Sequence, residues 1–319
     1  ILNLIMGSQI PSHLPIVDFI DENMKPATDS WLSTCHVVRT ALEDHGCFVV
    51  RYNKVSPELC RTIVSEMKQL FGLPLETKKQ ETSDKLFHGY YGQIPSLPLY
   101  ESFGIDDPLT FHGTHKFTHI MWPQGNDHFR ESINKYAKML AEIDQVVKRM
   151  VFESYGVDQT KCNSMIESGN YLLRCLQYRP HLIDESDLGM QPHTDLTMQS
   201  ILHQVNNIHG LEVKLKDGQW IVVDPSPSLF LVLAGDGFKV WSNGRIKACE
   251  HRVIMNAKNM RYSMGLFSFN GKTLQIPEEV VDEQHPLLYK PFDHFEYLRF
   301  FDKEKIRESD LRVKTYCGL

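Results

Sequence analysis

Three short segments of the chain carry side chains that could hold a metal ion and bind an organic acid. His193 and Asp195 are separated by one residue, and His251 follows 58 residues after His193. Two histidines and one carboxylate form the facial triad that holds non-haem Fe(II) and leaves coordination positions open for reactants. Arg261 and Ser263, a little further on, could clamp a carboxylate beside the metal. The set predicts an iron enzyme that activates O2 with an organic-acid cosubstrate.

The spacing of these residues indicates how strands would present them. Side chains at positions i and i+2 of a strand point to the same face, so His193 and Asp195 are predicted to open one strand together. His251 is predicted to begin a second strand of the same barrel. Arg261 and Ser263 would likewise share one strand face, although an arginine there could instead pair with an acidic residue of the barrel.

A second histidine cluster competes for the metal. His112, His115 and His119 lie close together, and the i, i+4 pair could bind zinc if the segment were helical. No Cys, Asp or Glu lies close by in sequence to complete the shell, and the surrounding segment is predicted to be a loop. We therefore expect these histidines to lie at the surface or to face substrate.

The first half of the chain is predicted to be mostly helical. Residues 29–45 begin with capping residues and stop at Gly46, and Pro57 is well placed for the first turn of a helix through Phe71. A strong helical period in residues 133–151 ends before Gly156. Between them, residues 47–52 are predicted to form a strand and residues 77–125 an irregular segment.

The second half changes to short β-prone runs separated by turns. Asp217-Gly218 is a hairpin signal, and Ser242-Asn243-Gly244 marks another turn. Many short strands at this spacing are typical of a jelly roll. We expect a mainly β fold with helices: residues 9–160 as a helical region with a substrate lid, and residues 161–319 as a double-stranded β-helix core with a C-terminal helix. The predicted strands are 171–178, 198–205, 211–215, 220–223, 229–234, 252–255 and 262–267.

Composition excludes several classes of protein. With 319 residues, 42% hydrophobic and 23% charged, the chain can bury a large core. A net charge of −6 argues against nucleic acid or an anionic membrane as partner, and no apolar run is long enough to span a bilayer. Residues 1–8 lack the basic start of a secretion signal, and seven scattered cysteines indicate reduced thiols. We expect a cytoplasmic monomer.

The motifs together resemble the plant iron- and 2-oxoglutarate-dependent dioxygenases over roughly residues 13–300. The stretch 235–253, which contains His251, follows the family pattern, as do the segments around Asp195 and Arg261. Segments 87–90, 121–123 and 282–291 are typical of the branch containing the alkenyl- and hydroxyalkyl-glucosinolate-forming enzymes and similar steroidal-alkaloid hydroxylases.

The resemblance implies roles for individual residues. Fe(II) would be held by His193, Asp195 and His251, with ascorbate as reductant. The distal carboxylate of 2-oxoglutarate would meet Arg261 and Ser263, assisted by Tyr178. Its oxidative decarboxylation with O2 to succinate and CO2 would drive hydrogen abstraction from a small-molecule substrate. The chain departs from the family pattern at Leu176, where an asparagine is common.

Substrate-contacting residues are predicted from strand alternation and from the lid. Phe267 follows the clamp on the same face, and Arg174 shares the direction of Tyr178. Tyr90, Tyr100 and Phe103 lie in the expected lid, although ordinary core packing is an alternative for each aromatic residue. Arg174 could steer an anionic substrate or form an internal salt bridge.

Two other functions remain open from sequence. A hormone-inactivating oxidase of auxin or gibberellin would need a pocket for a carboxylate, which Arg174 could supply. A catalytically silent metal-binding scaffold is the other, but such a scaffold has no physical need for both triad and clamp. The first hypothesis is a dioxygenase of specialised metabolism that hydroxylates, desaturates or cleaves its substrate.

Overall fold

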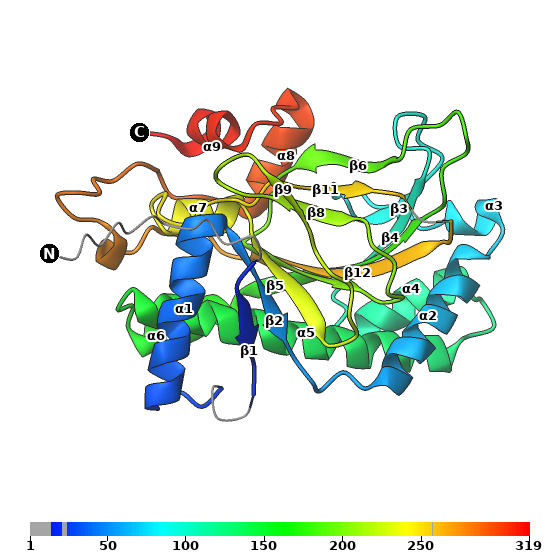
Figure 1. Ribbon diagram of the computed structural model, residues 1–319, viewed down its shortest axis with the longest axis horizontal. Helices are drawn as coiled ribbons and strands as arrows, with labels where there is room; N and C mark the ends of the chain where they lie inside the picture. The colour runs from blue at the N-terminus through cyan, green and yellow to red at the C-terminus, as the bar shows by residue number, and fades with distance from the viewer. Residues whose placement is uncertain (1–13, 21–23, 257) are drawn as a thin grey trace, which may run out of the picture.

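Two sheets of mostly antiparallel strands form the centre of the molecule (Figure 1). A computed structural model of the chain describes residues 14–20, 24–256 and 258–319. The large sheet has the order β1-β2-β10-β7-β12-β5-β4-β3 and the small sheet the order β6-β11-β8-β9. The large-sheet strands are β1 (Ile16–Asp18), β2 (Cys47–Arg51), β3 (Gly89–Tyr91), β4 (Tyr100–Asp106), β5 (Gly169–Tyr178), β7 (Gln199–Gln204), β10 (Leu229–Ala234) and β12 (Arg261–Asn270). The small-sheet strands are β6 (Leu188–His193), β8 (Leu211–Lys214), β9 (Trp220–Val222) and β11 (His251–Ile254).

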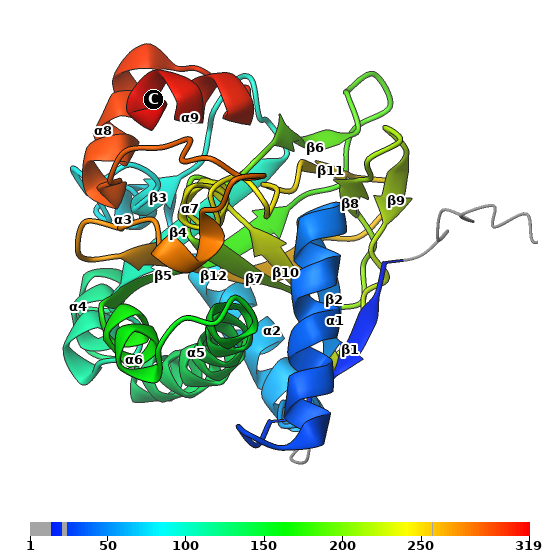
Figure 2. The same ribbon diagram turned by 90° about the vertical axis from the view of Figure 1, so that its left-hand side faces the viewer.

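Helices cover the outer face of the large sheet and one end of the molecule. Figure 2 shows α4, α5 and α6 on one side of the large sheet, with α8 and α9 on the other. The helices are α1 (Asp29–His45), α2 (Pro57–Phe71), α3 (Leu75–Lys78), α4 (Phe111–Met121), α5 (Asp127–Ser154), α6 (Gln159–Glu167), α7 (Asp236–Trp241), α8 (His294–Glu304) and α9 (Ser309–Cys317), with a short 3-10 helix at Glu278–Val280. The predicted jelly-roll core backed by helices is confirmed.

Local sequence explains where the main helices begin and end. The Thr28 hydroxyl accepts a hydrogen bond from the amide of Trp31 and caps α1, one residue before the predicted cap. Gly46 ends α1 at φ 69°, where an added Cβ would lie 2.5 Å from the carbonyl oxygen of Lys247. In α5, the residues at helical spacing, such as Ile133, Leu140 and Val147, are fully buried against the large sheet.

The prediction of an irregular segment over residues 77–125 was wrong for three parts of it, at residues 89–91, 100–106 and 111–121. Strands β3 and β4 extend the large sheet beside β5, and α4 covers residues 111–121. Aromatic residues, glycine and proline obscured the strand period there, because both faces of β4 are largely buried. Strands β1 to β4 all come from the N-terminal half, so the boundary near residue 160 divides the chain but not the sheet.

Two apolar clusters stabilise this arrangement. The larger one lies between the helices and the large sheet and includes Phe48, Ile63 and Tyr136. The smaller one lies between the two sheets and includes Leu176, Val213 and Val253. All seven cysteines are buried and free, as expected for reduced thiols. Within the described ranges, no helix has the length and apolar character needed to cross a membrane.

Candidate metal and cosubstrate site

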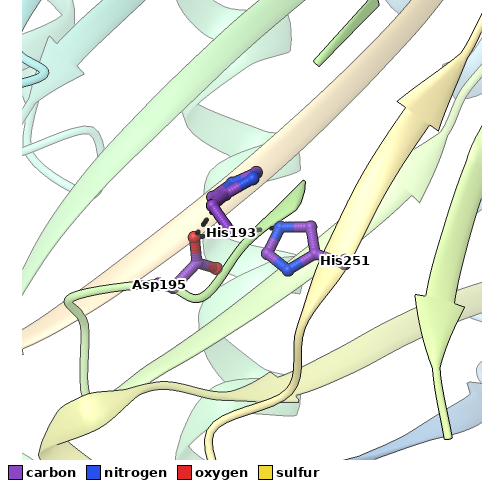
Figure 3. A group of neighbouring side chains, drawn as sticks. All are labelled: His193, Asp195 and His251. Atoms are coloured by element: carbon purple, nitrogen blue, oxygen red, sulfur yellow. Dashed lines mark ion pairs between the residues drawn. The ribbon is translucent and has the colours of Figure 1, made fainter. Parts of the chain in front are cut away.

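The structure brings His193, Asp195 and His251 together between the two sheets (Figure 3). His193 ends β6 and lies directly opposite His251, the first residue of β11. One potential ligand atom from each of the three residues lies within 4.8 Å of the others. The Nε2 atoms of His193 and His251 are 3.8 and 3.9 Å from Oδ1 of Asp195. Ligand atoms about 2.0–2.2 Å from one ion are at most about 4.4 Å apart, so the two distances to Asp195 are short enough for a shared metal.

The imidazoles are oriented by backbone carbonyls. Nδ1 of His193 lies 2.8 Å from the carbonyl oxygen of Gln191, and Nδ1 of His251 lies 3.2 Å from that of Cys249. Such bonds fix the tautomer and leave Nε2 for a metal. Desolvation, together with the charge of a protonated His251, lowers the pKa of His193 to about 4. This imidazole is therefore neutral near pH 7, as ligation requires.

Asp195 reaches the site from a turn, which corrects the prediction that it shares a strand face with His193. Strand β6 stops at His193, and β7 begins only at Gln199. The Ser200 hydroxyl donates to Oδ2 of Asp195 at 2.6 Å, and the amide of Asp236 donates to its carbonyl oxygen at 3.0 Å. Side-chain and backbone bonds thus hold Asp195, not strand alternation.

The predicted clamp lies in the same cavity. Arg261 is 1% exposed, and its Nη2 donates to Oε1 of Gln204 at 3.0 Å. Its Nη1 lies 3.2 Å from the Ser263 hydroxyl, and its guanidinium carbon lies 5.1 Å from the centre of the Tyr178 ring. No Asp or Glu in the described part of the chain pairs with Arg261, which disfavours the internal salt bridge considered as the alternative. A buried guanidinium without a counter-charge is suited to an anionic ligand.

A cavity of about 330 Å³ joins the triad, the clamp and an aromatic region. Alternate residues of β5 and β12 line it, as the strand period requires. Gly265 lies between Ser263 and Phe267 on the same face of β12, where an added Cβ would come 2.7 Å from the Phe267 ring, so glycine leaves room for that ring. The lining residues from β5 are Leu172, Arg174, Leu176 and Tyr178, and those from β12 are Arg261, Ser263, Phe267 and Phe269.

The structure separates the predicted substrate residues into two groups. Phe267, Arg174 and Tyr100 line the cavity. Phe103 is fully buried in the helix-sheet core, and Tyr90 packs on it at 5.0 Å between ring centres; neither lines the cavity. Tyr100 and Phe103 belong to β4 and not to a loop.

Several lining residues escaped the sequence reasoning. Phe269 lines the cavity and could have been predicted from the strand alternation that selected Phe267. Gln204, on β7, also lines the cavity. Phe87, Phe301 and Arg312 also line the cavity, but they come from a loop and from two C-terminal helices. No local period connects such segments to a site, so sequence spacing carried no signal for them.

The competing histidines lie on a helix, not on the predicted loop. His115 and His119 stack at 6.2 Å between ring centres on the exposed face of α4. Among the described residues, the triad is the one group of three or more His, Cys, Asp or Glu side chains close enough to share an ion.

Comparison with known proteins identifies the family. Residues 168–270 match the 2OG-Fe(II) oxygenase superfamily, and residues 14–110 match the model described as non-haem dioxygenase in morphine synthesis N-terminal. The probable 2-oxoglutarate-dependent dioxygenase AOP1 of Arabidopsis thaliana is 41% identical over 298 residues, covering 91% of this chain and 97% of that protein. The 2-oxoglutarate-dependent dioxygenase AOP3 of the same plant is 30% identical over 98% of this chain and 99% of that protein.

A solved structure supports the same assignment. The Arabidopsis thaliana dioxygenase for auxin oxidation 1, in complex with 2-oxoglutarate, superposes with a TM-score of 0.76 at 29% identity and covers 86% of this chain and 100% of that one. The chain belongs to the 2-oxoglutarate- and Fe(II)-dependent oxygenases. Within them it is related to the AOP dioxygenases, which confirms the branch indicated by the sequence motifs.

Proposed function

We propose that this protein is a dioxygenase that oxidises a small specialised metabolite with O2 and 2-oxoglutarate. One observation carries the proposal: the triad and an unpaired Arg261 open into one cavity of about 330 Å³. For hydroxylation, substrate, O2 and 2-oxoglutarate would give hydroxylated product, succinate and CO2. Desaturation and oxidative cleavage are the other outcomes open to the same site.

The protein's own residues would position the reactants. Fe(II), held by His193, Asp195 and His251, would supply the O2-activating chemistry when bound, together with 2-oxoglutarate. Arg261 and Ser263 would bind the distal carboxylate of 2-oxoglutarate, with Tyr178 packed against the guanidinium. The apolar walls from β5 and β12 would exclude water from the reacting centre.

A second candidate, oxidation of an acidic hormone such as auxin, is favoured by Arg174. This residue is 9% exposed, and its Nη2 donates to the hydroxyls of Tyr100 and Ser102 at 2.9 and 2.6 Å. Its Nε has no hydrogen-bond partner, and no described Asp or Glu pairs with it. Its guanidinium carbon lies 5.4 Å from the centre of the Tyr91 ring. Likeness to an auxin-oxidising enzyme supports this candidate, and an anionic specialised metabolite would use the same group.

The decisive experiment measures succinate formed from 2-oxoglutarate without added substrate, under Fe(II) and ascorbate. We expect weak turnover in the wild type and its loss in His193→Ala, since ligation by that imidazole is removed. His115→Ala is the matched control, because it removes a histidine of the competing cluster and should leave turnover unchanged. Equal turnover in wild type and His193→Ala would refute the metal assignment, and no turnover in the wild type would favour the silent scaffold.

We further propose that the protein acts as a cytoplasmic monomer without a nucleic-acid or membrane partner. Seven free buried cysteines are typical of a protein in a reducing compartment. A net charge of −6 disfavours nucleic acid or an anionic membrane as partner.

A further inference from the structure

The C-terminal end of the chain contacts the end of β6 and the turn that follows it, which together carry two of the three metal-site residues. Arg307, in the connection between α8 and α9, donates from Nη1 to the side-chain oxygen of Gln191. Arg312, on α9, donates from Nη2 to the hydroxyl of Thr194 at 2.8 Å. Gln191 also supplies the carbonyl that orients His193. Contacts from this end of the chain therefore flank the segment between His193 and Asp195.

Arg312 is held in place by a buried network. It is 2% exposed, and its Nε lies 2.9 Å from both Oδ2 of Asp236 and the hydroxyl of Tyr297. Its Nη1 donates to the carbonyl oxygens of Ile306 and Arg307 at 3.2 and 2.8 Å. All three guanidinium nitrogens are thus used, which fixes the direction of the one bond that leads to Thr194.

Asp236 links the same network to the backbone of a metal-site residue. The Asp236 side chain is fully buried and accepts from Arg312, Tyr297 and Ser309. Its amide donates to the carbonyl oxygen of Asp195 at 3.0 Å. The Arg312–Asp236 pair therefore braces both Thr194 and Asp195, where no strand holds the chain.

Charge pairing sets Arg312 apart from the other buried arginines of the cavity. Arg261 and Arg174 have no acidic partner among the described residues, whereas Arg312 pairs with Asp236. A neutralised, fully hydrogen-bonded guanidinium has little capacity left to bind an anionic ligand. The position of Arg312 beside the metal site is better explained by its bonds to Thr194 and Asp236.

We propose that Arg312 is a positioning residue for the metal: through Thr194 and Asp236 it fixes the turn between His193 and Asp195, so metal affinity depends on α9. The proposal rests on the metal-binding role of the triad. Partners one bond removed from metal ligands typically change metal affinity by about 10- to 100-fold. Because Arg312 acts through the turn and not on a ligand side chain, we expect an effect of about 10-fold.

The test measures the dissociation constant of Co(II) for the metal-free full-length protein by calorimetry, without 2-oxoglutarate. Arg312→Ala would leave the Asp236 carboxylate buried and unpaired, so the informative variant is Thr194→Val, which removes only the hydroxyl acceptor. We expect Co(II) binding about 10-fold weaker, in a metal-free protein that still unfolds in one transition above the temperature of the binding measurement. Thr194→Ser, which restores the hydroxyl, should bind Co(II) within about two-fold of wild type.

Thr315→Val is the matched control, because Thr315 is an exposed residue of α9 whose hydroxyl bonds only within the helix, to the carbonyl of Leu311. It should bind Co(II) as wild type does. Wild-type affinity in Thr194→Val, or equal weakening in Thr194→Val and Thr194→Ser, would overturn the proposal. Absence of Co(II) binding in the wild type would instead contradict the proposed function, so the two failures are distinguishable.

Discussion

The two ends of the cavity are built in different ways. At the metal and cosubstrate end, strands β5, β6, β11 and β12 supply most of the functional groups, and each group has a fixed partner within the protein. At the substrate end, strand residues such as Phe267 meet side chains from the loop of Phe87 and from helix α8. One end has a geometry fixed by strand pairing, and the other combines segments from distant parts of the chain.

This difference matches what each end has to recognise. A cosubstrate shared by a whole family needs one arrangement of charge, and a strand register supplies it reproducibly: Arg261 lies opposite Tyr178, and Ser263 opposite Leu176. A substrate that differs between family members is better met by loops and helix ends, which can change without disturbing the sheets. Specificity should therefore reside at the aromatic end, and cosubstrate binding at the strand end.

The largest expected effect is a loss of affinity for 2-oxoglutarate when Arg261 is replaced at the cosubstrate end. Arg261→Leu removes the guanidinium from the cosubstrate end, and truncating one partner of a buried charge pair costs roughly 2–5 kcal/mol, or roughly 30- to 4,000-fold in affinity. We expect the dissociation constant for 2-oxoglutarate, measured by calorimetry with Mn(II) in place of iron, to rise by such a factor. An unaltered constant would mean that the cosubstrate carboxylate lies elsewhere.

A smaller loss of affinity is expected at the substrate end, where Arg174 is replaced. One charged hydrogen bond contributes roughly 1.5–3 kcal/mol, so Arg174→Leu should weaken binding of a substrate carboxylate by roughly 10- to 100-fold. Affinity for 2-oxoglutarate should stay within about two-fold. Calorimetry with arylacetic acids and their neutral amides, in the presence of Mn(II) and 2-oxoglutarate, checks this, because the amides should not respond.

One control variant completes that experiment. Arg61→Leu makes the same change of charge on the exposed face of α2, where the side chain of Arg61 is 70% exposed, and should affect neither ligand. If Arg174→Leu weakened 2-oxoglutarate as strongly as Arg261→Leu, the two ends would not be separate binding sites.

Sequence alone predicted the cavity residues on strands β5 and β12 better than those on loops and helices. Alternation predicted that Arg174 shares a face with Tyr178 and that Phe267 shares one with Arg261 and Ser263, and all five line the cavity, since a strand repeats every two residues whatever surrounds it. The same rule misplaced Asp195, because β6 ends at His193 and tertiary hydrogen bonds then take over. Strand pairing brings His193 opposite His251, and hydrogen bonds from Ser200 and Asp236, not the i+2 spacing, hold Asp195 beside them.

The remaining failures share a physical cause. Phe103 was expected at the lid, but a bulky aromatic on a strand buried on both faces gives no indication of which side meets the cavity. Arg312 was not considered at all, since its contact with Thr194 spans 118 residues and depends on how α9 packs. Contacts of this kind follow from tertiary packing and leave no local pattern.

The smallest predicted effect is on the pH dependence of stability, and it comes from a buried histidine of the large sheet. Burial lowers the pKa of His203, on β7, to about 4, and its Nδ1 is hydrogen-bonded to the hydroxyl of Tyr136 on α5. The unfolded chain, with an ordinary histidine pKa near 6.5, binds a proton that the folded protein does not bind between about pH 6.5 and 4. Titration of His203 therefore leaves the free energy of unfolding unaffected well above pH 6.5 and lowers it as the pH falls toward 4.

Between pH 7.5 and 6, His203 should account for a loss of about 1 kcal/mol in the free energy of unfolding. His203→Gln keeps a polar partner for Tyr136 but does not titrate, so its urea-unfolding free energy should fall less over that range than the wild type's. Identical pH dependence in the two proteins would show that His203 is not held neutral by burial. Because the His203 ring is hydrogen-bonded to Tyr136 and to the carbonyl of Ser226 and not to the triad or Arg174, the affinities of the wild type for Co(II) and for arylacetic acids should not differ from those of His203→Gln at pH 7.5.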